Sequence, residues 1–174
     1  TLNLIRTREG APYYVDSRGN YWRMYLFIEG ATCYNLVEKP EDFYQSGKAF
    51  GHFQRLLAHY PARELAETIP GFHDTPGRFR AFSKAVEEDI CGRASEVQNE
   101  IQFVMDREQD MGLAMDMLAK GELPLRVTHN DTKLNNIMID DKTGQAICII
   151  DLDTVMPGLS IFDFGDSIRF GANT

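Results

Sequence analysis

The amino-acid sequence predicts an α+β fold in which strands stand on both sides of a helical middle. Three observations lead to this prediction. Aromatic and β-branched residues flank a turn-forming cluster in residues 11–29. Apolar residues then recur every three or four positions from residue 40 to residue 120, a spacing typical of amphipathic helices. Short apolar runs separated by polar turns follow from residue 125 to residue 150.

Composition and charge narrow the classes of partner. The chain has 174 residues and is 43% hydrophobic and 25% charged, which is ordinary for a globular protein. Its 26 acidic residues outnumber its 18 lysines and arginines and give a formal charge of −8. No basic run reverses this balance, so we expect no nucleic-acid partner.

The cysteines and the hydropathy pattern bear on the compartment. Cys33, Cys91 and Cys148 are odd in number and show no CxxC spacing, so we expect reduced thiols rather than disulfides or a zinc site. No uninterrupted apolar run reaches the roughly 18 residues that a membrane span needs, and no signal peptide is recognisable. We therefore expect a cytoplasmic protein without a membrane partner.

Residues 11–29 are predicted to form a β-hairpin. Residues 11–15 lead into a cluster of turn formers at 16–20, and residues 21–28 return with aromatic and β-branched side chains. Gly30 breaks the second strand. Residues 31–40 then lack a clear period, and we expect them to form an irregular linker.

Three helical regions are expected in the middle of the chain. The first begins at Pro40, because proline and the acids after it favour a helix N-terminus, and it stops before Pro61. The second covers residues 79–90. The third runs from residue 97 to about residue 120, where a glycine and then a proline end it.

The loop before the second helical region has two interpretations. His73, Asp74 and Arg78 are candidates for contacts with an acceptor substrate. Asp74 or Thr75 is equally suited to cap the helix that follows. The sequence leaves both interpretations open.

A polar loop, residues 129–136, lies between the first two of three short predicted strands at 125–128, 137–139 and 146–150. Its candidate functional residues, with the acid that ends the third strand, are His129, Asp131, Lys133, Asn136 and Asp151. These residue types suit phosphoryl transfer, in which an acid orients a hydroxyl, a cation approaches a phosphate, and an amide with a second acid binds Mg²⁺. The alternative is a surface turn rich in Asn and Asp. The flanking strands and the position of Asp151 favour an active site.

The order of these residues resembles a known family. Residues 129–136, followed by Ile150 and Asp151, resemble the catalytic loop and metal-binding strand of the protein-kinase-like fold, in its aminoglycoside phosphotransferase and choline kinase branch. Residues 22–30, 72–76 and 150–158 are similar to N-acetylhexosamine 1-kinases, which phosphorylate the anomeric hydroxyl of N-acetylglucosamine or N-acetylgalactosamine.

The resemblance implies a role for each residue of the site. Asp131 would be the catalytic base and Lys133 would approach the transferring phosphate of ATP. Asn136 and Asp151 would bind Mg²⁺, with Asp153 as a second acid at the metal. His129 would support the loop rather than take part in the chemistry.

The resemblance also implies a division of the chain into lobes. Residues 1–30 would be the last strands of an N-terminal lobe with the hinge, where Phe27, Ile28 and Glu29 would contact adenine through backbone groups. Residues 31–174 would form part of the helical C-terminal lobe, whose small β-hairpin carries the catalytic loop.

A second acidic motif, Asp163-Phe164-Gly165, spells the metal-binding motif of protein kinases. Asp163 lies 27 residues past Asn136, whereas Asp151 lies 15 past it and ends the returning strand. The spacing therefore assigns the metal to Asp151, and Asp163 is expected to brace the catalytic loop.

Two parts of the family pattern are not found in the sequence. It shows no glycine-rich phosphate loop and no strand lysine before residue 11, so we expect an internal fragment of a kinase that binds ATP poorly by itself. The alternatives for the parent protein are a kinase of a choline-like or aminoglycoside-like alcohol and a non-catalytic kinase-like interaction lobe. A sulfatase is disfavoured because no C/S-x-P-x-R string is present.

Overall fold

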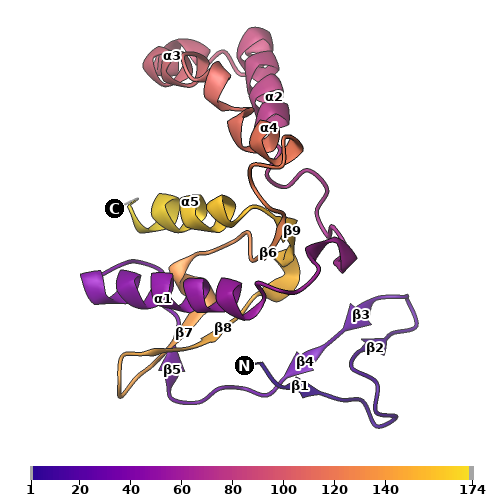
Figure 1. Cartoon of the computed structure of the whole chain (residues 1–174). Helices are drawn as coiled ribbons and strands as arrows, with labels where there is room; N and C mark the ends of the chain where they lie inside the picture. Colours follow the sequence, from indigo (N-terminus) through magenta and orange to yellow (C-terminus); the bar gives the residue numbers. More distant parts are fainter. Residues whose placement is uncertain (1, 173–174) are drawn as a thin grey trace.

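The computed structural model describes residues 2–172 and confirms a mixed helix and strand architecture. Figure 1 shows three parts: an N-terminal hairpin, a body in which two helices cover small sheets, and a helical arm that projects from the body. Among the described residues, no helix combines the length and the apolar composition that crossing a membrane requires.

The N-terminal hairpin consists of β1 (Leu4–Ile5), β2 (Tyr14–Val15), β3 (Tyr21–Trp22) and β4 (Met24–Tyr25). Strand β2 pairs with β3 and β1 pairs with β4, both antiparallel. Asp16 closes the turn by accepting hydrogen bonds from the main-chain amides of Arg18 and Asn20 and from the Trp22 indole. The predicted hairpin is therefore confirmed, although its return strand is interrupted at Arg23 and ends before residue 28.

The predicted linker at residues 31–40 is partly wrong, because it begins with a strand. Strand β5 (Ala31–Thr32) pairs with β7 (Ile137–Asp140), with Ala31 opposite Asp140. The hydroxyl of Thr32 also donates a hydrogen bond to the Asp141 carboxylate at 2.8 Å. A two-residue strand has no readable period, and its partner lies more than 100 positions away in the chain.

Helix α1 (Pro40–Leu56) begins where its proline predicts. The main-chain amide of Lys39 donates to the Asp42 carboxylate at 3.1 Å, which satisfies one of the free donors at the helix start. Phe50 is 4% exposed and forms the main core with three aliphatic residues from the other half of the chain, Leu134, Ile137 and Ile139. This core joins α1 to the strands that follow the polar loop.

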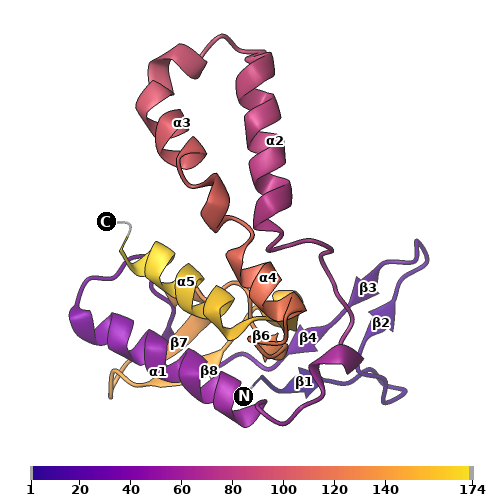
Figure 2. The same cartoon turned by 45° about the horizontal axis from the view of Figure 1, so that its top comes forward.

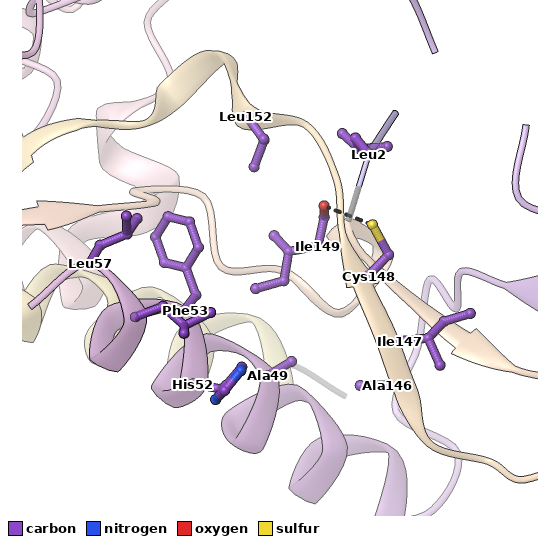
Figure 3. A pocket seen from close by; sticks show the side chains of 11 residues that line it. Leu2, Ala49, His52, Phe53, Leu57, Ala146, Ile147, Cys148, Ile149 and Leu152 are labelled. Carbon is purple, nitrogen blue, oxygen red and sulfur yellow. Dashed lines mark hydrogen bonds between the residues drawn. The ribbon is translucent and has the colours of Figure 1, made fainter. Parts of the chain in front are cut away.

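A groove lies between α1 and β8 (Ala146–Ile149). Figure 3 shows Phe53 and Leu57 of the α1 region on one side and Ile147 and Ile149 on the other. Its lining is largely apolar, and its volume is about 410 Å³.

The helical arm consists of α2 (Thr75–Glu88), α3 (Gln98–Met105) and α4 (Leu113–Ala119), with short 3₁₀ turns at Ala94–Val97 and Glu108–Asp110. Helices α2 and α3 lie side by side and stand away from the body in Figure 2. The third predicted helical region is not continuous, because it breaks between α3 and α4. Asp106 and Gly112, which lie in this break, both have low helix propensity.

The second half of the body contains β6 (Arg126–Thr128), β7, β8, β9 (Met156–Gly158) and α5 (Ser160–Gly171). The expectation that one small hairpin carries the polar loop is wrong. Strand β7 pairs with β8, but β6 pairs with β9, so the loop passes from one small sheet to another. Helix α5 lies beside α1 and packs against β6, which places its first turns next to the loop (Figures 1 and 2).

Candidate active site

The second residue of the polar loop, Asn130, has a left-handed conformation. Asn130 has φ of 68°, and asparagine tolerates this region better than most side chains. Its side-chain amide donates to the main-chain carbonyls of Thr128 and Thr154, and its oxygen accepts from the Thr128 hydroxyl at 2.9 Å. Asn130 therefore fixes the direction in which the loop leaves β6.

Asp163 braces the loop from α5, as the sequence predicts. It is 2% exposed, and its carboxylate accepts hydrogen bonds from the main-chain amides of His129 at 3.1 Å and Asn130 at 2.7 Å. A third donor, the side-chain amide of Gln54 in α1, lies at 2.8 Å. Hydrogen bonds to a charged acceptor are stronger than those between neutral groups, and three of them stabilise this buried carboxylate.

A second acid of α5 holds the next part of the loop. Asp166 accepts a hydrogen bond from the main-chain amide of Thr132 at 2.8 Å, and the Thr132 hydroxyl donates to the carbonyl of Asp163 at 2.6 Å. No role for Asp166 is predicted from the sequence. Its spacing from Asp163 could have indicated one, because acids three residues apart lie on the same face of a helix.

His129 ties the loop to the end of β8. Its ring is fully buried and lies edge-on to Phe50 and Phe53, with ring centroids 5.2 and 5.9 Å apart. Its Nε2 lies 3.1 Å from the carbonyl of Ile150, which can only accept, so Nε2 carries the proton. The packing and hydrogen bonding expected of His129 are confirmed, and its exclusion from the chemistry stays a prediction.

Three of the predicted site residues meet at one point. Lys133 Nζ lies 2.8 Å from Asp131 Oδ1, and the side-chain amide of Asn136 donates to Asp131 Oδ2 at 2.9 Å and to the Asp131 carbonyl at 2.8 Å. Both carboxylate oxygens of Asp131 therefore have partners. The Asp131 side chain is 17% exposed, so it faces solvent only in part. Its orientation is fixed by residues of its own loop.

Asp151 reaches the same region through the β7–β8 pairing. Ile137 lies opposite Ile149, and the main-chain amide of Ile150 donates to the carbonyl of Asn136 at 2.9 Å. Asp151 follows directly, with φ of 56° and ψ of 59°, and its side chain is exposed. Within residues 2–172 its carboxylate has no hydrogen-bond partner. A left-handed aspartate without local side-chain bonds is unusual, and such outliers concentrate at functional sites.

Asp153, two residues further on, is engaged elsewhere. Its carboxylate forms an ion pair with Arg23 of the N-terminal hairpin, and its carbonyl accepts from the Thr68 hydroxyl at 2.9 Å. The structure thus directs its side chain toward the hairpin.

The predicted hinge residues connect the hairpin to β5. Phe27 is 80% exposed, and Ile28 is half-buried. Across residues 2–172, the main-chain groups of Phe27, Ile28 and Glu29 have no hydrogen-bond partner. Their donors and acceptors are therefore available to another molecule.

The loop before α2 caps that helix. Asp74 accepts from the main-chain amide of Gly77 at 2.9 Å, and Arg78 donates to the carbonyl of Phe72 at 2.7 Å. The ring of His73 lies edge-on to Phe72 and tilted against Phe162, with ring centroids 4.9 and 4.7 Å apart. Burial lowers the pKa of His73, and the nearby main chain of Asn130 partly opposes this shift. The capping interpretation of Asp74 is confirmed.

The donor set near Asp131 suits one kind of metal. No group of three or more His, Cys, Asp or Glu side chains gathers within residues 2–172 to hold an ion alone. Mg²⁺ does not need such a group, because it is usually bound by one or two carboxylates together with substrate phosphates and water. Asn136 donates its amide hydrogens to Asp131, which leaves its Oδ1 available as an oxygen ligand, and its main-chain carbonyl accepts from Ile150, the residue before Asp151. The residues present therefore fit magnesium bound together with a phosphate ester.

Comparison with protein families adds one finding. The model of the APH family, described as the phosphotransferase enzyme family, matches residues 5–174. The match includes the polar loop, Asp151 and both acids of α5.

Proposed function

The chain belongs to the phosphotransferase enzyme family, and we propose that it takes part in ATP- and Mg²⁺-dependent transfer of a phosphoryl group to a hydroxyl of a small molecule. The membership also implies the protein-kinase-like fold. The observation that carries the proposal is the orientation of Asp131 by Lys133 and Asn136.

Asp131 is the proposed catalytic base. A carboxylate held from two sides presents its remaining lone pairs in a fixed direction, where an acceptor hydroxyl donates its hydrogen bond and is aligned for attack. In phosphoryl transfer most of the catalysis comes from such positioning and from stabilising charge. The anchoring of the loop by Asp163 and Asp166 supports this role, because it limits movement of the Asp131 backbone.

Lys133 is the proposed phosphate contact. Its side chain is 36% exposed and pairs with Asp131. Because the ammonium group is already partly open to solvent, it can turn from the carboxylate toward a bound phosphate. It would then stabilise the charge on the transferring group while Asp131 is free to accept the hydroxyl proton.

Asn136 and Asp151 are the proposed metal ligands. ATP supplies the phosphoryl group, and Mg²⁺ neutralises the charge of its phosphates. The side-chain oxygen of Asn136 and the unpaired carboxylate of Asp151 support this assignment. Asp153 stays a prediction as a second acid at the metal, and its ion pair with Arg23 favours the different role argued below.

Phe27, Ile28 and Glu29 are the proposed adenine contacts, through the main-chain groups that have no partner among the described residues. We also propose that the chain divides into two lobes, with residues 1–30 ending the N-terminal lobe and residues 31–174 forming part of the C-terminal lobe. The pairing of β5 with β7 supports a boundary near Gly30, since it ties the chain from Ala31 onward to the sheet that follows the catalytic loop.

The proposed acceptor is the anomeric hydroxyl of an N-acetylhexosamine, which rests on the resemblance of residues 22–30, 72–76 and 150–158. Other small alcohols of the choline or aminoglycoside type are the competing acceptors. A panel of these compounds with Mg-ATP and the full-length protein, with ADP production as the readout, separates them. Turnover with none of the panel would overturn the proposed activity.

The Asp131→Asn variant tests the site in the same assay. Loss of a general base typically costs about 10²- to 10⁴-fold in rate, and we expect kcat to fall by that amount while the thermal unfolding temperature is kept. Asp110→Asn, in an exposed turn of the arm, is the matched control. A near-normal rate for Asp131→Asn would show that Asp131 is not the base.

A further inference from the structure

We propose that Arg23 and Asp153 form a tie that positions the N-terminal hairpin against the metal-binding segment, so that Asp153 acts as a positioning residue through Arg23. This inference rests on the proposed function, because it assigns Asp151 to the metal and residues 27–29 to adenine.

The first observation is that the tie stands alone. Within residues 2–172, the Arg23–Asp153 pair is the only ion pair or hydrogen bond between the hairpin strands β1–β4 and the residues after Gly30. Figure 1 shows the hairpin beside the body, connected to it by the chain that leads into β5. This pair is therefore the polar contact that places the hairpin, alongside the apolar lining that Leu2 contributes to the groove at β8.

The second observation is that both ends of the tie are held in place. Arg23 interrupts the return strand between β3 and β4, and its guanidinium lies over the ring of Tyr25, 5.6 Å from the centroid. Asp153 lies in the 3₁₀ turn Leu152–Thr154, where its carbonyl accepts from the Thr68 hydroxyl at 2.9 Å. Two prepositioned partners lose less side-chain entropy when they pair than two free ones.

The third observation is that the turn carrying Asp153 is bonded to the catalytic loop. The hydroxyl of Thr154 donates to the carbonyl of His129 at 2.6 Å, and its own carbonyl accepts from the Asn130 amide at 2.9 Å. Asp151 immediately precedes the same turn. A change in the position of Asp153 should therefore also change the positions of Asp151, the proposed metal ligand, and of the loop that holds Asp131.

Exposure decides what kind of effect the tie has. The Arg23 and Asp153 side chains are 45% and 65% exposed, and exposed ion pairs contribute little to global stability. Their effect is expected on the relative position of hairpin and body, and therefore on nucleotide affinity. A carboxylate that is neutralised by an arginine is also a poor ligand for a cation.

A double-mutant cycle in the full-length protein tests the tie. We expect Arg23→Ala and Asp153→Ala each to raise the KM for ATP about two- to fivefold, which matches the usual strength of an exposed pair, with a smaller change in kcat. The double variant should be no worse than either single variant, and exchange of the two charges (Arg23→Asp with Asp153→Arg) should recover part of the loss. Arg18→Ala, an exposed arginine of the hairpin turn, is the control. Additive effects of the single variants would overturn the proposal.

Metal binding separates the two roles of Asp153. With a non-hydrolysable ATP analogue present, Mn²⁺ affinity measured by electron paramagnetic resonance should weaken for Asp151→Asn by about tenfold or more. Asp153→Asn should weaken it only about as much as Arg23→Ala does, because both break the same tie. A loss with Asp153→Asn equal to that with Asp151→Asn would make Asp153 a ligand instead.

Amide hydrogen exchange of the ligand-free protein tests the tie without turnover. Arg23→Ala should speed exchange in residues 150–155 and leave α2 unchanged. Unchanged exchange in residues 150–155 would overturn the tie even if the kinase activity is confirmed. Conversely, the absence of turnover with every acceptor of the panel would overturn the proposed function and leave the exchange result standing.

Discussion

Asp163 accepts a 2.7 Å hydrogen bond from the main-chain amide of Asn130, 33 positions earlier in the chain. This contact joins the first turn of α5 to the residue that precedes the proposed base. Helix α5 therefore holds the loop through main-chain amides, and the side chains of Asp131, Lys133 and Asn136 are not used for this attachment.

Asp163→Asn should weaken this brace. An amide in place of the carboxylate has one accepting oxygen for three donors, so at least one buried main-chain amide loses its partner or its charge-assisted bond. We expect the free energy of unfolding to fall by about 1–3 kcal/mol, measured by urea denaturation. Asp110→Asn should leave it unchanged, and an equally stable Asp163→Asn would show that the brace is not energetically important.

Gly158→Ala should disturb the start of the loop. A Cβ at this buried position would overlap the Thr128 hydroxyl and lie 3.1 Å from Asn130 Oδ1, both in the network that fixes the direction of the loop. Overpacking of this kind costs about 1–3 kcal/mol, which thermal or urea unfolding can measure.

Gly165→Ala provides the matched control for that substitution. A Cβ at Gly165 meets no heavy atom within 4 Å, and alanine favours a helix over glycine by about 1 kcal/mol. The two substitutions should therefore change stability in opposite directions. Destabilisation by both would indicate that the close approach at Gly158 is not the cause.

His73 should make stability depend on pH. Burial lowers its pKa below the ordinary value of 6.5, against the opposing effects of the Asn130 main chain and of Asp166. Below pH 6.5 the unfolded chain therefore binds a proton that the folded protein does not, and the free energy of unfolding falls as the pH decreases.

His73→Phe keeps an aromatic ring against Phe162 and removes the titration. We expect a smaller decrease in the free energy of unfolding between pH 7 and pH 5 than in the unmodified protein, measured by urea denaturation at each pH. His59→Gln, at an exposed position, should retain the full decrease. An unchanged pH dependence for His73→Phe would contradict this assignment.

Asp151→Asn should raise the metal requirement of the proposed reaction. Substitution of a residue that only hydrogen-bonds to a metal ligand already costs about 10- to 100-fold in metal affinity, and loss of a direct ligand should cost at least as much. The Mg²⁺ concentration for half-maximal rate in the full-length protein is the measurement. Asp141→Asn, in the turn after β7, should leave that concentration unchanged, and a normal Mg²⁺ requirement for Asp151→Asn would remove it from the metal site.

Much of the local structure could be predicted from the sequence. Proline at position 40 marks the start of α1, and the hairpin of β7 and β8 follows from its apolar runs and the turn between them. The meeting of Asp131, Lys133 and Asn136 was also predictable in outline, since six residues in one short loop cannot lie far apart. These features depend on neighbours in the chain.

The pairing of distant segments could not be predicted in the same way. The partners of β5 and β6, the hydrogen bond that Thr132 donates to Asp166 and the tie between Arg23 and Asp153 each join residues at least 28 positions apart. Sequence periodicity shows which side chains seek burial or a partner, but it does not show which partner they reach.

The sequence by itself determined the α+β class, the polar loop and the residue types for phosphoryl transfer, because propensity, periodicity and side-chain chemistry act locally. Only the tertiary structure decided that the loop bridges two sheets, that Asp166 of α5 holds it beside Asp163, and that Asp153 faces Arg23. Those outcomes depend on the combined free energy of packing α1 and α5 against the strands, which no single segment contains.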